Sequence, residues 1–115
     1  MPTESPREAF AYIAGYIDGE ATIGYWSGYP ELKIDTCNPQ PLRFLSKHFG
    51  GNVLTLKRKT KSNRTVYRLQ YQRSTAIKVL THTVEFLHEK KKQANMCLQM
   101  HEMNLALRAD KKKSH

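Results

Sequence analysis

The chain has 115 residues, 39% of them hydrophobic, which suffices for one compact domain and leaves no room for a second. Its net charge of +9, from 19 Lys and Arg against 10 Asp and Glu, indicates a polyanionic partner, and nucleic acid is the usual one. The sequence offers no membrane-spanning run, no secretory signal and no cysteine pattern typical of disulfides or zinc, so we expect an intracellular protein without a membrane partner.

The first helix is predicted from residue 6 to about residue 19. Residues 5–8 resemble a capping box, with a serine at the N-cap and a proline at the first helical position. Ala11, Gly15 and Gly19 recur every four residues, so one side of this helix is small enough for another helix to approach closely. Packing on the domain's own sheet is the alternative, and we favour the contact between helices.

Four strands and further helices are predicted after it. Alternating polarity indicates two pairs of strands: residues 21–27 with 31–37, and residues 52–59 with 65–73. A short helix separates the pairs over residues 42–49, and helical spacing of apolar residues resumes at residue 74. The order αββαββα(α) predicts one α+β domain over residues 1–115, whose antiparallel sheet has helices on one face and leaves the other face open.

The last helix carries a stripe of methionines. Met96, Met100 and Met103 are spaced so that they lie on one side of the helix together with Leu107. We interpret the stripe as a packing surface, in the core or between subunits, because flexible methionine side chains fill irregular apolar gaps. The tail after this helix, residues 109–115, is basic and is expected to be disordered.

The positive charge is concentrated in the middle of the chain. Residues 36–84 contain ten basic residues and no acidic one, and seven of these bases fall between residues 53 and 73. Lys and Arg contact phosphates and guanine edges, and Gln suits adenine edges. A solvated polar sheet face is the alternative, but it would be expected to carry mixed charge. We therefore predict that the open face binds DNA through Thr22, Trp26, Lys33, Asp35, Thr55, Lys57, Lys59, Arg68, Gln70 and Gln72.

Two acids, Asp18 and Glu20, stand at the end of the first helix, within a segment of net charge −4 over residues 1–35. Carboxylates weaken the binding of a polyanion unless a cation lies between them. Mg²⁺ takes one or two carboxylates and draws its other ligands from water and phosphate, and beside a phosphodiester it activates water. Solvated acids at a helix end are an equally good interpretation of these two residues alone.

Residues 13–21, with the sequence IAGYIDGEA, resemble the signature motif of the LAGLIDADG homing endonucleases. Glu20 replaces the second aspartate of that motif, and Ala21 replaces its final glycine. The order of elements, the glycines that end the helix at 50–51 and the lysine-containing segment 90–95 also match small single-motif members, so the resemblance covers about residues 8–107. Four positions are identical to the motif: Ala14, Gly15, Ile17 and Asp18.

The resemblance implies an active site at the end of the motif helix. Glu20 would coordinate the catalytic Mg²⁺, and Gly19 would offer its backbone carbonyl to the same ion. Lys90 would lie near the attacked phosphate and stabilise its developing charge, although Lys91 and Lys92 are neighbouring candidates. Asn38 would position solvent.

The resemblance also implies a homodimer. One motif per chain means that a second copy supplies the other catalytic acid, with the motif helices packed through Ala11, Gly15, Asp18 and Gly19. The expected function is then a Mg²⁺-dependent, site-specific double-strand DNA endonuclease, acting on a long pseudo-palindromic site without a small-molecule cofactor. A non-cleaving protein of the same fold, such as an intron maturase or a transcriptional regulator, is the alternative. A monomeric ribosomal-type RNA-binding protein is the third possibility.

Overall fold

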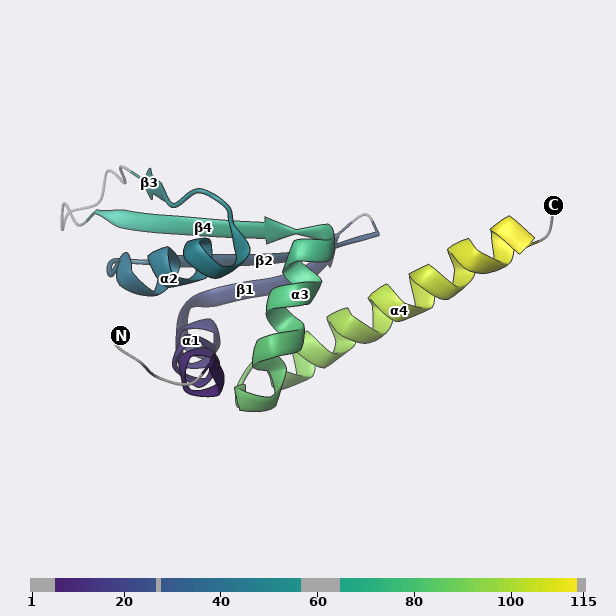
Figure 1. Cartoon of the computed structure of the whole chain (residues 1–115), viewed down its shortest axis with the longest axis horizontal. Coiled ribbons are helices and arrows are strands. Elements are labelled where there is room, and N and C mark those ends of the chain that lie inside the picture. The colour runs from purple at the N-terminus through teal and green to yellow at the C-terminus, as the bar shows by residue number, and fades with distance from the viewer. Residues whose placement is uncertain (1–5, 27, 57–64, 114–115) are drawn as a thin grey trace.

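The structure, a computed structural model, describes residues 6–26, 28–56 and 65–113 (Figure 1). The predicted order of elements is confirmed. Ser5, Lys57 and Lys59, which were assigned roles above, lie outside the described residues. In chain order the elements are α1 (Pro6–Glu20), β1 (Ala21–Trp26), β2 (Tyr29–Thr36), α2 (Gln40–Phe49), β3 (Leu54–Leu56), β4 (Val66–Gln72), α3 (Arg73–Thr83), the short 3-10 helix η1 (Val84–Phe86) and α4 (Lys91–Lys113).

The four strands form one antiparallel sheet in the order β1-β2-β4-β3. Within β2, Leu32 and Ile34 are buried while Lys33 between them is partly exposed, as the alternation of side chains along a strand requires. The buried residues face the helices, and the other face of the sheet is left open, as predicted. The sheet therefore presents one apolar and one polar side.

The core lies between the sheet and the helices. Ile13 and Ile17 of α1, one turn apart, are fully buried and belong to the same cluster as Leu32 and Leu69 of the sheet and Leu80 of α3. Each such side chain contributes roughly 1.5–3 kcal/mol when it leaves water. The motif helix is thus held firmly by one side, and its other side, with Ala11, Gly15 and Gly19, stays exposed.

Strand β3 directs its side chains to the opposite faces of the sheet from those predicted. Its register pairs Leu54 with Arg68 and Thr55 with Tyr67, and directly opposed residues point to the same face of a sheet. Thr55 therefore lies on the helix side, and its predicted place on the open face is wrong. The physical reason is that Val53 packs against the core, so the strand period of two also places Thr55 on the helix side, where it remains exposed, and leaves Leu54 51% exposed on the open face.

Helix α4 is the longest element and projects away from the sheet (Figure 1). The predicted disordered tail is wrong for residues 109–113, because the helix continues to Lys113. The segment from residue 105 is rich in Leu, Ala, Arg and Lys, which are good helix formers, and basic residues are favourable in a last turn. Among the helices of the described chain, none is both long and apolar enough to cross a membrane.

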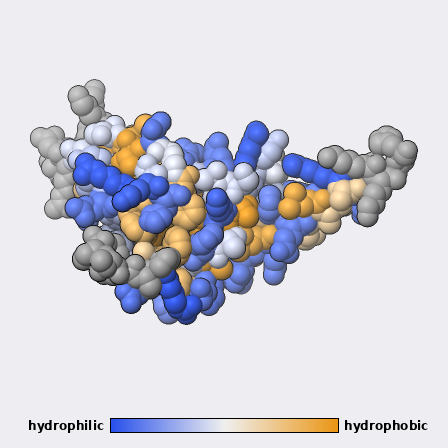
Figure 2. Space-filling view, in the orientation of Figure 1, coloured by the Kyte–Doolittle hydropathy of each residue, from blue (hydrophilic) through white to orange (hydrophobic). Residues whose placement is uncertain are grey.

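The methionine stripe lies on the outer side of α4. Met96, Met100, Met103 and Leu107 are all exposed, Met103 by 65%, so the interpretation as core is wrong for the single chain. Apolar residues along the projecting helix are visible in Figure 2. The inner side of α4 is the one that packs, with Ala94 fully buried.

Candidate catalytic site and nucleic-acid interface

Asp18 joins the end of α1 to the beginning of α4. Its carboxylate accepts hydrogen bonds from the backbone N–H of His88 at 2.8 Å and of Lys90 at 3.0 Å. Both residues lie just before Lys91, the first residue of α4, and the Lys90 carbonyl accepts the first hydrogen bond of that helix, from Ala94. A negative charge beside a helix N-terminus is favourable. A third hydrogen bond joins Asp18 to Lys90, because the Lys90 ammonium donates to the backbone carbonyl oxygen of Asp18 at 2.8 Å. Asp18 therefore connects the end of α1 with the segment that leads into α4, within its own chain.

Glu20 lies in a cleft of about 480 Å³, bounded by the end of α1, the end of β2 with the turn that follows it, and the beginning of β4. We call it the Glu20 cleft. It brings Glu20 and Asn38 together, two of the three predicted catalytic residues, and Lys90 is not among its lining residues. Glu20 itself is exposed, so its carboxylate is accessible to a ligand. The lining residues are Tyr16, Glu20, Asp35, Thr36, Cys37, Asn38 and Val66.

Asn38 is fixed by three hydrogen bonds at the turn between β2 and α2. Its backbone N–H donates to Thr36 Oγ1 at 3.2 Å, and its Oδ1 accepts from the backbone N–H of Gln40, the first residue of α2, at 3.1 Å. The remaining amide group, Nδ2, donates to the hydroxyl of Tyr16 at 3.4 Å. The side chain is thereby held between the beginning of α2 and the Glu20 cleft, which it lines.

Tyr16 is one of the lining residues of the Glu20 cleft that sequence reasoning missed. It precedes Glu20 by four residues, so both lie on one side of α1, and this spacing was the signal available in the sequence. The Tyr12 hydroxyl donates to the Tyr16 hydroxyl at 3.4 Å, and this bond raises the pKa of Tyr12. Cys37 was also missed as a cleft residue, and a lone cysteine after a strand gives no such signal.

The open face of the sheet carries most of the predicted DNA-binding residues. Across the central pair, β2 and β4 place Lys33 opposite Gln70 and Asp35 opposite Arg68. Arg68 donates to both oxygens of Asp35, at 2.7 and 2.9 Å, and this hydrogen-bonded pair raises the pKa of the guanidinium. Gln72 is the next residue on this face. Arg68 and Gln72 are thus engaged with the carboxylates of Asp35 and Glu31, the latter through a bond of 3.3 Å. Lys33 and Gln70 add an ammonium and an amide to the same face, and such groups suit contact with phosphates and base edges.

Trp26 covers the outer end of β1 on the same face. A Cβ built on Gly24 would meet the Trp26 ring at 2.4 Å, so the indole lies directly across the backbone of Gly24. The ring is nevertheless 58% exposed, which leaves a flat apolar surface beside Thr22. The predicted open-face positions Thr22 and Trp26 thus share one side of β1.

The donor set at the end of α1 fits Mg²⁺ in part. Glu20 offers one exposed carboxylate, and the last carbonyls of α1, including that of Gly19, have no partner within the helix. Within the described ranges no group of three His, Cys, Asp or Glu residues is placed to hold a metal. Since Mg²⁺ typically uses one or two protein carboxylates and completes its shell with water and phosphate, these donors fit a site that DNA and a second carboxylate would complete.

This architecture, a motif helix that ends at the edge of an open antiparallel sheet, is the fold of homing endonucleases. The homing endonuclease I-CvuI, crystallised with the I-CreI target and Mg and with the DNA not cleaved, matches with a TM-score of 0.56 and 21% identity, covering 82% of this chain and 66% of I-CvuI. A second structure of I-CvuI, with its own target and Ca, matches with a TM-score of 0.54 and 20% identity over the same shares.

An archaeal intron-encoded homing endonuclease, I-Vdi141I, complexed with DNA, matches with a TM-score of 0.59 and 18% identity, covering 89% of this chain and 72% of that one. The chain thus spans about two thirds of the length of I-CvuI, at 66%. The sequence matches no protein-family model and no curated protein. At these identities the likeness establishes the fold, as the resemblance in the motif predicted.

Proposed function

We propose that the chain is a Mg²⁺-dependent endonuclease that cuts both strands of DNA at a long, partly palindromic site, in the manner of the LAGLIDADG homing endonucleases. The observation that carries the proposal is the position of Glu20, an exposed carboxylate in a cleft that Asn38 and Asp35 share, at the inner end of the open polar face. A carboxylate beside a surface built for phosphates is the arrangement a metal-assisted nuclease needs. The protein would act inside the cell, where DNA is found.

The residues of this chain have separable roles in the proposed reaction. Glu20 and the Gly19 carbonyl would hold Mg²⁺, which when bound supplies an activated water and stabilises the leaving oxygen. Asn38, fixed by its bonds to Thr36 and Gln40, orients solvent in the cleft. Lys90, whose ammonium is anchored at the Asp18 carbonyl, provides positive charge near the end of α1.

The exposed glycines of α1 support the proposed homodimer. A glycine inside a helix costs about 1 kcal/mol relative to alanine. At Gly15 and Gly19, a Cβ would find nothing within 4 Å among the described residues, so no contact with that part of the chain explains their size. A second motif helix approaching this side would explain it, and would place two Glu20 side chains near each other. Ala11 lies one turn before Gly15 and is exposed as well.

Cleavage of DNA tests the proposal directly. The chain is incubated with DNA of its own coding locus from which the gene has been removed, with Mg²⁺ or with EDTA. We expect cutting in Mg²⁺, none in EDTA, and none by Glu20→Gln, while Glu102→Gln, an exposed acid on α4, cuts normally. Tight binding without cutting would overturn the nuclease and leave a non-cleaving nucleic-acid-binding protein of this fold.

The oligomeric state is measured by light scattering. We expect a mass near twice 13.3 kDa for the native chain and a shift toward the monomer for Gly15→Leu, which inserts a bulky side chain between the helices. Ala106→Leu, which places the same side chain at another exposed position, on α4, serves as the control. A native monomer would contradict the homodimer and favour the monomeric RNA-binding alternative.

A further inference from the structure

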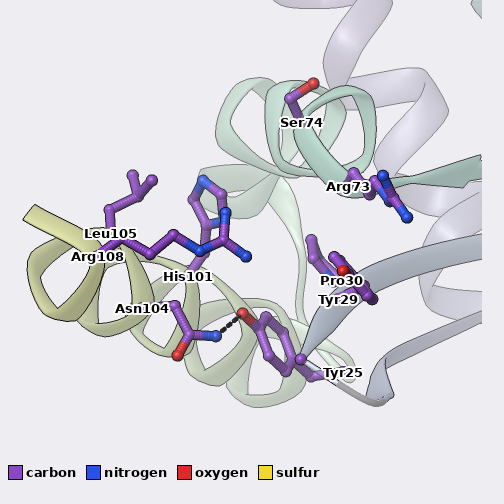
Figure 3. Close-up of a pocket in the computed structure, with 10 residues that line it drawn as sticks. Tyr25, Tyr29, Pro30, Arg73, Ser74, His101, Asn104, Leu105 and Arg108 are labelled. Carbon is purple, nitrogen blue, oxygen red and sulfur yellow. Dashed lines mark hydrogen bonds between the residues drawn. The ribbon is translucent and has the colours of Figure 1, made fainter. Parts of the chain in front are cut away.

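A second cleft lies at the opposite end of the sheet from Glu20. It is bounded by the β1–β2 hairpin, the beginning of α3 and the outer half of α4, and its volume is about 390 Å³ (Figure 3). We call it the hairpin-end cleft. From α4 it receives His101, Asn104 and Arg108, spaced so that one side of that helix faces it. None of these residues belongs to the predicted DNA-binding set.

The chemistry of the hairpin-end cleft is that of an anion site. Arg73 of α3 and Arg108 of α4 bring two guanidinium groups to it, His101 adds an imidazole, and none of its lining residues is acidic. Figure 3 shows Arg108 extending from α4 into the space between the helix and the hairpin. Among the described residues, neither guanidinium has a carboxylate within ion-pair distance. Guanidinium groups match the geometry of phosphate and bind it in a bidentate manner.

The walls of this cleft are held in place by contacts across it. Asn104 of α4 donates a hydrogen bond to the Tyr25 hydroxyl, which ties the projecting helix to β1 (Figure 3). The Arg73 guanidinium lies 4.3 Å from the centre of the Tyr29 ring. Arg73 also has a φ of +58°, a left-handed backbone conformation that costs a non-glycine residue roughly 1–2 kcal/mol. The cationic side chain is thus fixed above the hairpin.

The hairpin-end cleft continues onto the open face of the sheet. A neighbouring hollow of about 250 Å³ shares Tyr29, Pro30 and Arg73 with it. This hollow also includes Trp26, Gln72 and one acid, Glu31, whose carboxylate accepts a hydrogen bond from Gln72. Strand β1, of six residues, separates this end of the sheet from Glu20 by about 20 Å. A nucleic-acid strand that leaves the open face at the hairpin would therefore pass over these basic side chains.

We propose that the hairpin-end cleft binds a phosphate group through Arg73, Arg108 and His101, and that this phosphate belongs to the DNA backbone at the outer end of the half-site. The assignment of this phosphate to DNA rests on the proposed function, whereas the binding of a phosphate group in the hairpin-end cleft does not. Binding there would extend the contact of each subunit beyond the sheet and fix α4 against the duplex.

The imidazole of His101 reports on occupancy by NMR. The histidine side-chain signals are recorded at fixed ionic strength while inorganic phosphate replaces chloride, and then with a mixed-sequence DNA duplex; His101→Asn identifies the signal. We expect saturable shifts of His101 with both probes and none with phosphate in the Arg73→Gln/Arg108→Gln double variant. His48 of α2, far from the cleft, is the internal control.

The outcomes separate the site from its ligand. No shift of His101 with either probe overturns the proposal. A shift with phosphate, but none with a duplex that binds elsewhere, supports a site for free phosphate and overturns the DNA source. If the mixed-sequence duplex does not bind at all, DNA as the source of the phosphate is overturned, the phosphate titration still decides the site, and the cleavage assay on the coding-locus DNA judges the proposed function separately.

The salt dependence of DNA binding provides a second test. Each neutralised phosphate contributes a slope of about −0.9 to the plot of log affinity against log salt. We expect the slope of the Arg73→Gln/Arg108→Gln variant to be less negative than that of the native chain by about 0.9. Over a fourfold rise in salt, the affinity of the native chain for DNA then falls about 3.5-fold more than the affinity of the variant. Arg43→Gln/Lys47→Gln, two exposed bases on α2, removes the same charge and should leave the slope unchanged. Equal losses in both variants would show a general charge effect and contradict a specific contact.

Discussion

The capping of α4 by Asp18 predicts a stability loss that does not depend on the function of the protein. Asp18→Ala removes the acceptor of two backbone N–H groups, at His88 and Lys90, while the bond from the Lys90 ammonium to the Asp18 carbonyl is retained because its acceptor is backbone. Each bond contributes about 1 kcal/mol, and loss of a capping residue costs about 0.5–2 kcal/mol. The Asp18 side chain is only half-buried, so in Asp18→Ala water can partly replace the carboxylate as the acceptor of the two N–H groups. We therefore expect Asp18→Ala to lower the free energy of unfolding by about 2 kcal/mol.

Asp18→Asn keeps one acceptor oxygen without the charge, so we expect about half that loss, about 1 kcal/mol. Urea unfolding at neutral pH measures both variants, and thermal unfolding should show a Tm lower by about 8 °C for Asp18→Ala. Amide hydrogen exchange gives a local check, because the N–H groups of His88 and Lys90 should exchange faster. Glu20→Ala, two residues away and exposed, is the matched control, with an expected change within about 0.5 kcal/mol. Equal stability of the Asp18→Ala and Glu20→Ala variants would refute the capping role.

Three further predictions concern single side chains. Exposed Cys37 should react rapidly with a thiol reagent, and the attached reagent should block the Glu20 cleft. Buried Cys97, whose pKa is raised by burial, should react slowly in the native state. Equal reaction rates of the two cysteines would contradict this prediction. Arg73→Gly should be more stable than Arg73→Ala by about 1 kcal/mol in urea unfolding, because only glycine adopts a left-handed φ without strain. Burial raises the pKa of Tyr71 to about 12, so its contribution to stability is complete below pH 10 and is lost as the pH rises from 10 toward 12. The free energy of unfolding of Tyr71→Phe should therefore depend less on pH in that range than that of the native chain. An identical pH dependence of the two would exclude Tyr71 as the cause.

Local patterns in the sequence were sufficient for the order of elements and for the two faces of β1, β2 and β4. In β2 and β4, residues at every second position are apolar over a whole strand, so Leu32 and Leu69 define the buried side without ambiguity. Strand β3 has only three residues, and there the pattern is too short to decide. Packing of the preceding Val53 decides it, and turns Thr55 to the helix side.

The candidate site could be predicted where its residues are close in sequence. Glu20 and Gly19 follow from the motif, and Tyr16 was within reach because it precedes Glu20 by one helical turn. The contact of Asp18 with His88 and Lys90 was not predictable in this way, because 70 and 72 residues separate the partners. The hairpin-end cleft escaped prediction for the same reason, since Arg73 and Arg108 meet only through the packing of α3 and α4 around the hairpin.

The long sequence separation between Asp18 and Lys90 has a consequence for synthesis of the protein. Contacts of this kind form late in folding, because a large loop must close before they contribute. A nascent chain that has emerged only as far as α3 contains Glu20 and the whole sheet, yet the end of its motif helix has no α4 to anchor it. The order of translation thus delays completion of the candidate site until the last quarter of the chain has been made, and a truncated product would be left with its DNA-facing strands and without the anchored helix end.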